Sequence, residues 1–513
     1  MFKLLRALFF SLIISLPLRA QILPKERSMI NYRLVGFSFP PMQDVSSYTI
    51  EIAQGNFITD SAFDKNIIKS VSASDNKILT EVPDWGKLYT WRTVYTGNNA
   101  AITKSALHHF SVLVTPNVDI NITRLRIIKQ AEKYKDSYIF SDGTRTLYDM
   151  GGHAIWTMPN ISDLNYNGDP ELSDLKLSSH GTITFLLGSQ ACEINYKADI
   201  LWKAPDNGTI SGDETEHYHH EFTRLSNGHY MVLGNEFGLW KRDSSIPENT
   251  YIKFLTGNKI NRDSLAFYSS AGYIMMPFGT IIEYDEKGNV VWSWKSSKYL
   301  NASDVIYYRP QKTLAGIPSY VNAFYFDQKA KDIYISFRDI SRIIKVKYPE
   351  GNVLDTYGEI YKPGAPVTGK NLFCEQHSCR ISEKGNLYLF NNNNCFHTAG
   401  IPKIIMMQQP VSEKDTLKKI WEYDCAKADN FQAAISTGGN VIELPDESFL
   451  VCMGKPYGTS FIVGKDKKIL WSGIPERFNM DTNIWERIPQ NRSSIITTRK
   501  ELEQLIWNAE NQK

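Results

Sequence analysis

The chain has 513 residues, of which 42% are hydrophobic and 22% are charged, so it has the composition of a folded globular protein rather than a disordered one. Its formal net charge is only +2, which gives no reason to expect binding to nucleic acid. One ordinary hydrophobic core is too small for this length, so we expect at least two domains.

The N-terminus has the pattern of a secretory signal peptide. Lys3 and Arg6 precede an apolar run, residues 7–16, and a potential cleavage site follows. The apolar run is shorter than a membrane-spanning helix needs. We therefore expect residues 1–20 to be removed, leaving an exported protein, periplasmic or extracellular, that has no membrane segment. An uncleaved anchor is the alternative, because Leu18 suits a cleavage site poorly.

Residues 25–115 have the pattern of a small β-sandwich. Side chains alternate between polar and apolar along residues 48–53 and again along residues 88–95, with aromatic residues in both segments. A period of two indicates half-buried strands. Residues 88–92 (LYTWR) follow a Trp-Gly turn, and this phrase resembles immunoglobulin and fibronectin type III domains. The resemblance concerns the fold and says little about chemistry.

A different rhythm begins near residue 135, where strands that end in tryptophan follow turns rich in Asp, Gly or Asn. The copies are residues 148–156, 194–202 and 283–292, with weaker ones ending at Trp421 and Trp471. Repeats of about fifty residues, each with several short strands, are typical of a β-propeller. We expect residues 135–490 to form a six-bladed propeller, with seven blades as the alternative, and residues 498–513 to form a helical tail outside the ring. The predicted fold class is therefore all-β.

Two of the predicted hairpins begin with histidine. Residues 217–230 (HYHHEFTRLSNGHY) and 376–388 (QHSCRISEKGNLY) both read as His, a short strand, a glycine turn and a second strand. Equivalent ends of propeller blades meet around one axis, so we expect His219, His220 and His377 to approach one another. Alternation along a strand would let only one of His219 and His220 face the channel.

The same phrases resemble bacterial aryl-sulfate sulfotransferases. The motifs that carry the likeness are residues 219–228 (HHEFTRLSNG), 321–327 (VNAFYFD), 336–338 (SFR), 376–380 (QHSCR) and 390–393 (FNNN). The likeness covers most of residues 25–470, and the order and spacing of the motifs carry it more than any one of them. The six-bladed propeller of that family agrees with the number of blades expected from the repeat.

The resemblance implies transfer of a sulfuryl group from a phenolic sulfate ester to another phenol, without a nucleotide donor. A neutral imidazole would carry the group covalently, while Arg and further His side chains would neutralise charge and move protons. The candidate catalytic residues are His377, His220, His219 and His397. The candidate substrate-binding residues are Arg380, Arg338 and Asn322. Such a site needs no metal or cofactor, and its partners are small aryl sulfates and phenols; a homo-oligomer is compatible with the sequence.

The chain departs from the family in two places. The family motif usually has His two residues before Asn322, where this chain has Tyr320, and the sulfated histidine of the family lies in a later blade, where residues 431–436 contain none. His397, or one of the pair at 219–220, is therefore an alternative nucleophile. Two other functions compete with the transferase. One is a propeller that lost the reaction and binds a small anion, a glycan or a protein, and the other is a hydrolase that passes the sulfuryl group to water.

Two further patterns concern stabilisation of the fold. Cys374, Cys379 and Cys395 lie close together in an exported chain, so we expect at least one disulfide in this cluster. Residues 163–174 place oxygen-bearing side chains and a glycine at the spacing of an EF-hand calcium loop. Asp174 stands where that loop normally has glutamate, so structural calcium and a polar inter-strand loop are both open interpretations.

Overall fold

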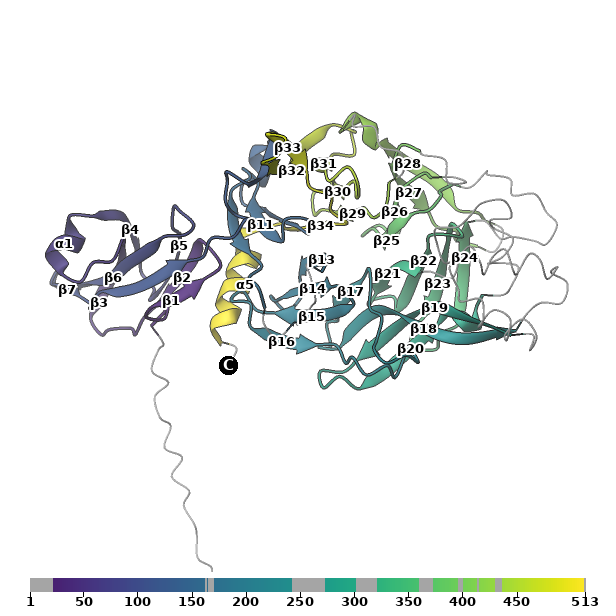
Figure 1. Cartoon of the computed structure of the whole chain (residues 1–513), viewed down its shortest axis with the longest axis horizontal. Helices are drawn as coiled ribbons and strands as arrows, with labels where there is room; N and C mark the ends of the chain where they lie inside the picture. Colours follow the sequence, from purple (N-terminus) through teal and green to yellow (C-terminus); the bar gives the residue numbers. More distant parts are fainter. Residues whose placement is uncertain are drawn as a thin grey trace, which may run out of the picture. The chain divides into compact units, whose positions relative to one another are not determined.

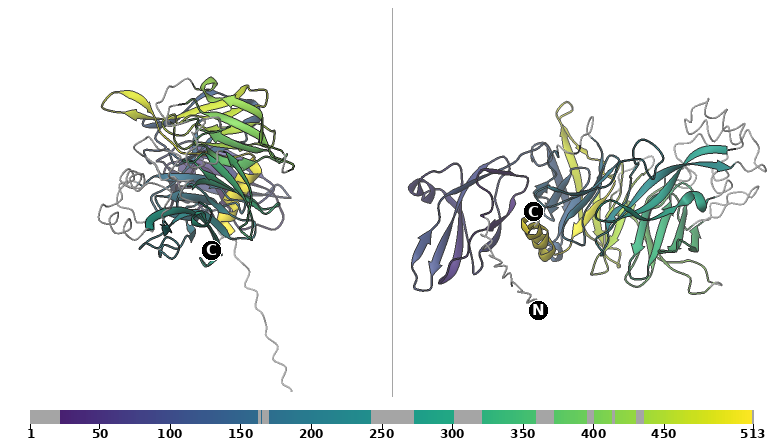
Figure 2. Two further views of the ribbon diagram at one scale, coloured as in Figure 1. Left: turned by 90° about the vertical axis from the view of Figure 1, so that its right-hand side faces the viewer. Right: turned by 90° about the horizontal axis from the view of Figure 1, so that it is seen from below.

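The computed structural model describes residues 22–161, 164, 170–241, 273–300, 321–358, 372–394, 400–412, 415–429 and 436–511. The chain divides into two compact units, Met1–Leu113 and Val114–Lys513. Strands make up 49% of the structure and helices 6%, and strands dominate both units in Figures 1 and 2. The prediction of an all-β protein is confirmed.

The first unit contains two sheets. Its strands are β1 (Ser28–Ile30), β2 (Leu34–Ser38), β3 (Val45–Gln54), β4 (Ile67–Ala73), β5 (Lys77–Glu81), β6 (Leu88–Gly97), β7 (Ile102–Lys104) and β8 (His108–Val112), and the helix α1 (Asp60–Asp64) precedes β4. One sheet has the order β1-β8-β6-β3-β4, with β7 also on β6, and the other pairs β2 with β5. Phe37 of β2 contacts Trp91 of β6, with ring centroids 5.0 Å apart. The two sheets therefore share one core, while the immunoglobulin-like or fibronectin-like type stays a prediction.

Within the described part of the second unit, the strands form six antiparallel sheets, which we number in chain order. Sheet 1 contains β10 (Tyr138–Ser141), β11 (Thr146–Asp149), β12 (Ala154–Thr157) and β34 (Ser493–Ile496). Sheet 2 contains β13 (Leu172–Leu177), β14 (Ile183–Leu187), β15 (Gln190–Ile194) and β16 (Ile200–Lys203). Sheet 3 contains β17 (Phe222–Arg224), β18 (Tyr230–Lys241), β19 (Tyr273–Tyr284) and β20 (Val290–Lys295).

The remaining three sheets follow the same plan. Sheet 4 contains β21 (Val321–Asp327), β22 (Asp332–Phe337), β23 (Arg342–Lys347) and β24 (Val353–Gly358). Sheet 5 contains β25 (His377–Ile381), β26 (Leu387–Asn391), β27 (Lys403–Gln408) and β28 (Lys418–Asp424). Sheet 6 contains β29 (Asn440–Glu443), β30 (Phe449–Cys452), β31 (Ser460–Val463) and β32 (Ile469–Asn479), and β33 (Ile484–Arg487) and β9 (Thr123–Lys129) both pair with β32.

The sheets succeed one another around a common centre, with the first strand of sheets 2 to 6 and β34 of sheet 1 nearest to it (Figure 1). The last strand of the chain completes the first sheet, because β34 pairs antiparallel with β10, with Ser494 opposite Phe140. Residues from the far C-terminus are thereby brought beside residues near position 140. The number of sheets equals the number of blades that the repeat predicted.

The repeated tryptophan joins neighbouring sheets. The buried indole of Trp156 in sheet 1 donates from Nε1 to the carbonyl of Tyr196 in sheet 2 at 2.8 Å. Trp471 in sheet 6 donates to the carbonyl of Met150 in sheet 1 at 2.9 Å. A buried indole N–H needs such an acceptor. The periodicity seen in the sequence therefore reflects a repeated contact between sheets, and one of these contacts joins the last sheet to the first.

The C-terminal helix α5 (Arg499–Asn511) covers the outside of sheets 1 and 2, as the yellow segment of Figures 1 and 2 shows. Arg499 donates to the hydroxyl of Tyr138 at 3.0 Å, and Asn508 donates to the carbonyl of His180 at 2.9 Å. Leu505 is fully buried on the inner face. Among the helices of the described residues, none has the length and apolar character needed to cross a membrane.

Two predictions about the chain lie partly or wholly outside the described residues. The predicted signal peptide is one of them. For the disulfide, the free buried thiols are Cys192, Cys379, Cys425 and Cys452. Only Cys374 and Cys395 remain to form the predicted bond, and Cys395 is not described. The disulfide stays a prediction.

Candidate active site

His219 and His220 form a tight turn just before β17. The N–H of Glu221 donates to the carbonyl of His219 at 2.8 Å, and His220 has φ 61°. This left-handed backbone is uncommon for a residue with a side chain. Because the pair lies in a turn and not in a strand, the alternation of side chains does not apply. Both histidines line the same cavity, so the expectation that only one would face the channel was wrong.

At the start of β25, His377 is also placed next to a residue with a left-handed backbone. His377 is the first residue of the strand, Ser378 has φ 52°, and the pairing register with β26 shifts immediately afterwards. The preceding residue, Gln376, donates from Nε2 to the Ser336 hydroxyl of sheet 4 at 2.9 Å. Asn322 donates to the carbonyl of Gln376 at 2.7 Å. The neighbouring sheet therefore fixes where His377 stands.

An asparagine fixes the proton of His377. Nδ1 of the imidazole lies 2.6 Å from Oδ1 of Asn392. The amide nitrogen of Asn392 donates to the carbonyl of Gly438 and to the hydroxyl of Ser436, each at 3.0 Å. A carbonyl accepts only, so the nitrogen of the amide must face Gly438 and its oxygen must face the imidazole. Nδ1 of His377 therefore carries the proton, and Nε2 keeps a lone pair.

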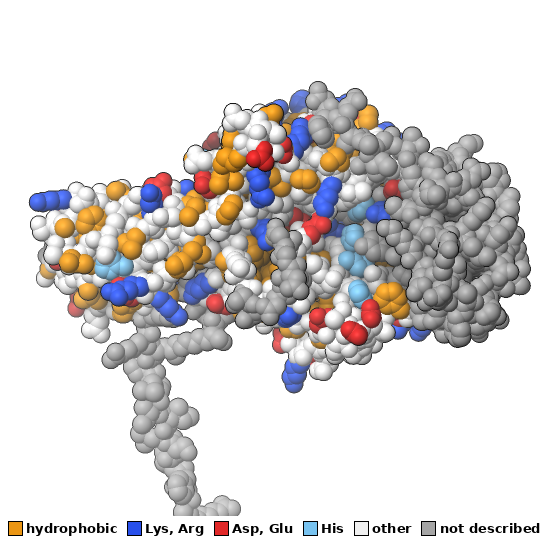
Figure 3. Space-filling model, in the orientation of Figure 1, with side chains coloured by type: hydrophobic (Ala, Val, Ile, Leu, Met, Phe, Trp, Pro, Cys, Tyr) orange, Lys and Arg blue, Asp and Glu red, His pale blue; other side chains and the backbone are white. Residues whose placement is uncertain are grey.

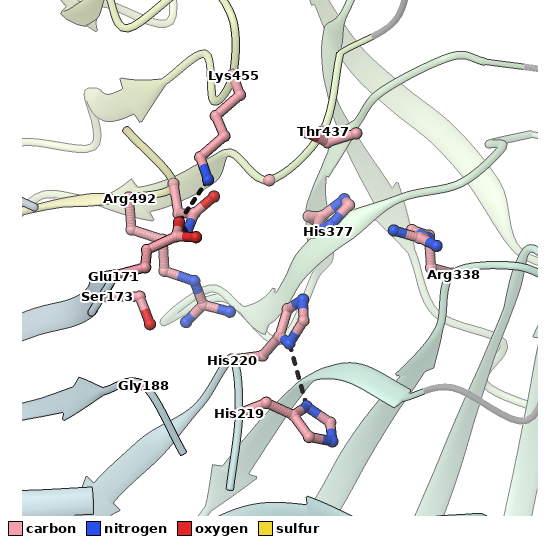
Figure 4. Close-up of a pocket in the computed structure, with 12 residues that line it drawn as sticks. Glu171, Ser173, Gly188, His219, His220, Arg338, His377, Thr437, Lys455 and Arg492 are labelled. Carbon is pink, nitrogen blue, oxygen red and sulfur yellow. Dashed lines mark hydrogen bonds and ion pairs between the residues drawn. The ribbon is translucent and has the colours of Figure 1, made fainter. Parts of the chain in front are cut away.

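The three histidines meet in one cavity of ≈ 380 Å³, a size within the range of small-molecule sites. The rings of His220 and His377 are roughly parallel, at 26°, with centroids 6.3 Å apart, and Nδ1 of His219 lies 3.1 Å from Nδ1 of His220. Figure 4 shows the three imidazoles together, and Figure 3 shows histidines beside charged side chains on the exposed face. The lining residues are Glu171, Ser173, Gly188, His219, His220, Arg338, His377, Thr437, Gly438, Lys455, Asn491 and Arg492.

Burial keeps the imidazoles neutral. It lowers the pKa of His219 to about 4 and the pKa of His377 to about 3. Burial also lowers the pKa of His220 well below its ordinary value, and the neighbouring His219, His377, Arg492 and Arg338 lower that pKa further. A neutral imidazole has one nitrogen with a lone pair, which is the form that acts as a nucleophile or as a base.

A network of charged side chains lies beside the histidines. Arg492 forms ion pairs with Asp174, at 2.9 Å, and with Glu221, and Lys176 contacts the same two carboxylates at 2.7 and 3.0 Å. Burial opposes ionisation of Glu221, but Arg492, Lys176 and Arg380 outweigh burial and hold the pKa of Glu221 at about 2. Three cations thus surround two carboxylates, so this part of the described site favours an anion.

The two predicted arginine clamps occupy different places. Arg338 lines the cavity, and its Nε donates to Oδ1 of Asp339 at 2.8 Å. In Figure 4, Arg338 and Arg492 lie on opposite sides of His220 and His377. Arg380 is not among the lining residues; it lies 3.7 Å from Glu221 and therefore belongs to the charge network. Asn322 is also fully buried away from the cavity lining.

Several predicted features fall outside the described residues. They are His397, Tyr320, residues 431–435 and most of the calcium loop. Asp174, the last residue of that loop, is described: one oxygen accepts from Lys176 and the other from Arg492. Among the described residues, no three His, Cys, Asp or Glu side chains come together as a metal site. Structural calcium stays a prediction.

The sequence pattern did not single out several residues of the cavity. They are Glu171, Ser173, Thr437, Lys455, Asn491 and Arg492. Arg492 comes from the segment that leads into β34, so it reaches the site only because the end of the chain completes the first sheet. The signal that could have found it is its place at the start of a strand, because His219 and His220 lie just before β17 and His377 is the first residue of β25.

Comparison with known proteins finds one family model that matches part of the chain. Residues 278–462 match the family model described as Arylsulfotransferase (ASST). The match supports the arylsulfotransferase family. It confirms the resemblance read from the sequence motifs, and it includes Arg338, His377 and Asn392 of the candidate site. It ends before Arg492 and begins after His219 and His220. No curated protein matches the chain.

Solved structures give only distant likenesses. A luciferin-regenerating enzyme shares 8% identity, over 72% of this chain and 99% of its own, with a TM-score of 0.33. A dihydro-heme d1 dehydrogenase shares 12% identity, over 74% of this chain and 78% of its own, with a TM-score of 0.30. A protein from Lactobacillus plantarum shares 9% identity, over 88% of this chain and 99% of its own, with a TM-score of 0.32. Likenesses of this size carry no argument about function.

Proposed function

We propose that this protein is an aryl-sulfate sulfotransferase that moves a sulfuryl group from a phenolic sulfate ester to a phenol, through a histidine and without a nucleotide donor. The observation that carries the proposal is the cavity in which neutral His219, His220 and His377 stand between Arg338 and Arg492. The arylsulfotransferase match supports the reaction class. We also propose that the second unit is a six-bladed β-propeller and that the mature protein is exported.

His377 is the best nucleophile among the described histidines. Its Nδ1–H is held by Asn392, its Nε2 has the lone pair, and the residue is buried. In the first step Nε2 attacks the sulfur of the ester and forms an N–S bond. The S–O bond to the aryl group breaks, and its electron pair leaves on the phenolate oxygen.

The second step reverses the first with a new phenol. The hydroxyl proton of the acceptor goes to a base, the phenol oxygen attacks sulfur, and the electron pair of the N–S bond returns to Nε2. His220 is the proposed acid and base. Its ring lies beside that of His377, and its Nδ1 lies within hydrogen-bond distance of Nδ1 of His219. A bound sulfate ester is negative and raises the pKa of a nearby imidazole, which prepares His220 to protonate the leaving phenolate.

The cations have a separate task. A sulfuryl group in transfer carries charge on its oxygens, and fixed guanidinium groups stabilise that charge. Arg338 and Arg492 lie on opposite sides of the proposed site. Arg492 is held by Asp174 and Glu221 and is buried, so its position is fixed before substrate arrives.

The test is release of 4-nitrophenol from 4-nitrophenyl sulfate by the mature protein, with and without added phenol. We expect release that depends on phenol, and its loss in His377→Ala. His153→Ala is the matched control, because that histidine is 70% exposed and does not line the cavity. Release that does not depend on phenol would instead indicate a hydrolase. Tight binding of the ester without release would indicate a binding propeller that has lost the reaction.

A further inference from the structure

Glu221 directly follows the turn that carries two of the cavity histidines. Its N–H donates to the carbonyl of His219 at 2.8 Å, and the residue between them, His220, has φ 61°. A hydrogen bond across a single residue with a left-handed backbone makes this a γ-turn of the rare, strained kind. Such a conformation persists only where the surrounding structure holds it. The contacts of Glu221 therefore bear on the position of His220.

The side chain of Glu221 is held by cations from three other sheets. One carboxylate oxygen accepts from Arg492, which directly precedes β34 of sheet 1. The other oxygen accepts from Lys176 of sheet 2 at 3.0 Å and lies 3.7 Å from Arg380 of sheet 5, the loosest of the three contacts. Hydrogen bonds between ionised partners are strong. This buried side chain, which precedes β17 of sheet 3, is therefore fixed from several directions.

Asp174 supports the same arrangement from sheet 2. One of its carboxylate oxygens accepts from Arg492 at 2.9 Å, and the other accepts from the backbone N–H of Phe222 at 2.9 Å. Phe222 is the residue after Glu221 and the first residue of β17. The chain segment that leaves the histidine turn is thus tied to Arg492 twice, once through Glu221 and once through Asp174.

This arrangement links two groups that the proposed reaction uses. His220 and Arg492 both line the histidine cavity (Figure 4), whereas Glu221 is not among the lining residues. The backbone of Glu221 closes the turn at His220, and its carboxylate pairs with Arg492. A reacting group that is misplaced by about 1 Å can lose about 10²-fold in rate. A residue that joins an acid–base group to a cation can therefore govern the rate without touching the substrate.

We infer that Glu221 is a positioning residue, which sets the place of the His220 imidazole relative to the Arg492 guanidinium. The inference rests on the proposed sulfuryl transfer for the roles of these two groups, the acid–base group and the cation. The contacts that carry it do not depend on the reaction, because they exist in the folded protein without substrate. The length of the side chain is essential, because its backbone and its charged end both meet fixed partners.

The kinetic test shortens the side chain and keeps its charge. In Glu221→Asp the carboxylate no longer reaches Arg492 while the backbone stays in place, so His220 and Arg492 shift relative to each other. We expect kcat to fall by about 10²-fold with phenyl sulfate and by about tenfold with 4-nitrophenyl sulfate, because a misplaced acid matters less for a good leaving group.

The matched control is Glu193→Asp. Glu193 is a buried carboxylate that pairs with Arg224 at 2.7 Å, and neither residue lines the histidine cavity. This variant should turn over both donors as the wild type does. Equal losses of kcat with the two donors in Glu221→Asp, or the same unequal losses in Glu193→Asp, would overturn the inference.

A second variant covers the case in which Glu221→Asp does not fold. Lys176→Gln removes a cation that holds Glu221 and leaves every residue of the cavity lining in place. Arg492 and Arg380 still balance the two buried carboxylates, so the fold should be retained. We expect the same dependence on the leaving group with a smaller loss, about three- to tenfold with phenyl sulfate. If only this variant folds, unchanged kcat with both donors overturns the inference.

A labelling measurement needs no turnover and separates this inference from the proposed reaction. Diethyl pyrocarbonate modifies neutral imidazoles that it can reach, and mass spectrometry of the digested protein gives the rate at each histidine. We expect His219 and His220 to react about threefold faster or more in Glu221→Asp and Lys176→Gln than in the wild type, because the turn opens more often. His153, which is 70% exposed, is the internal reference and should react at one rate in all three proteins.

The labelling result decides the inference even without an active enzyme. If the wild type turns over neither donor, faster labelling of His219 and His220 supports the inference while the proposed reaction fails. Unchanged labelling of both histidines overturns the inference whether or not the enzyme turns over.

Discussion

The starts of β17 and β25 deliver histidine to the same cavity in different ways. Before β17, His219 and His220 are partly exposed and contact each other at Nδ1. At β25, His377 is buried and its Nδ1 is held by Asn392, a side chain that is itself fixed from its other end. The comparison teaches that equivalent positions in two repeats need not have equivalent chemistry. The imidazole of His377, whose Nδ1 is fixed by Asn392, suits a nucleophile. The imidazoles of His219 and His220, which contact each other, suit proton transfer.

Loss of His377 gives the largest expected effect. His377→Ala removes the proposed nucleophile, so we expect kcat for 4-nitrophenyl sulfate to fall by about 10⁴ or more. Steady-state release of 4-nitrophenol measures it. A fall of only about tenfold would mean that another histidine carries the sulfuryl group. The roles assigned here to the histidines at β17 and β25 would then be wrong.

Arg338 and Arg380 test which side chains near His377 belong to the active site. Arg380 lies on β25 with His377 but does not line the cavity, whereas Arg338 does. Arg338→Gln removes a guanidinium from the cavity, and we expect kcat to fall by about 10²-fold. Arg380→Gln removes a partner of Glu221, so thermal stability should drop while kcat changes little. Parallel measurement of kcat and melting temperature separates the two. Equal losses of kcat in both variants would contradict the assignment of Arg380 to the charge network.

Loss of His220 should have a smaller effect than loss of His377. His220→Ala removes the proposed acid and base, which typically contributes about 10²-fold or more. The effect should depend on the leaving group, because a good leaving group needs little protonation. We therefore expect a greater loss with phenyl sulfate than with 4-nitrophenyl sulfate. Identical losses with both donors would rule out His220 as the acid.

The smallest expected effect is a change in pH dependence. The lowered pKa of His377, about 3, keeps Nε2 unprotonated, so this residue causes no fall in wild-type kcat/KM between pH 7 and pH 5. Asn392→Asp places a carboxylate beside Nδ1 and raises the pKa of His377. Activity should then fall as the pH drops through that raised pKa, because the protonated ring has no lone pair.

The control for this change is Asn394→Asp. Asn394 is similarly buried and donates to the carbonyl of Ser436 at 2.7 Å. It makes no contact with His377 among the hydrogen bonds of the described residues. A profile that moves equally in Asn392→Asp and Asn394→Asp would show that the effect is structural and that Asn392 does not set the proton of His377.

Local sequence signals predicted the strands because each sheet repeats them. Alternating side chains, glycine turns and a terminal tryptophan recur along the chain, and the tryptophan marks a contact between sheets, as Trp156 illustrates. The approach of His220 to His377 also followed from the repeat. The turn at His220 did not, because a left-handed backbone at histidine has no pattern that a strand period reveals.

Most of the contacts that the sequence did not predict join residues that are far apart in the chain. Arg492 lies beside Asp174 and Glu221 only after β34 joins sheet 1, and no local pattern predicts that pairing. Arg380 was a reasonable candidate by its place near His377, but its side chain meets Glu221 instead of the cavity. The position of a residue on a strand was predictable, whereas its partners across sheets were not.

The most direct test of the central claim is to locate the sulfuryl group on the protein. The protein is mixed with 4-nitrophenyl sulfate without acceptor, quenched, digested and mapped by mass spectrometry. We expect a burst of 4-nitrophenol equal to the enzyme concentration and one added sulfuryl group on His377. A sulfuryl group on His219, His220 or His397, or turnover without any modified histidine, would contradict the account.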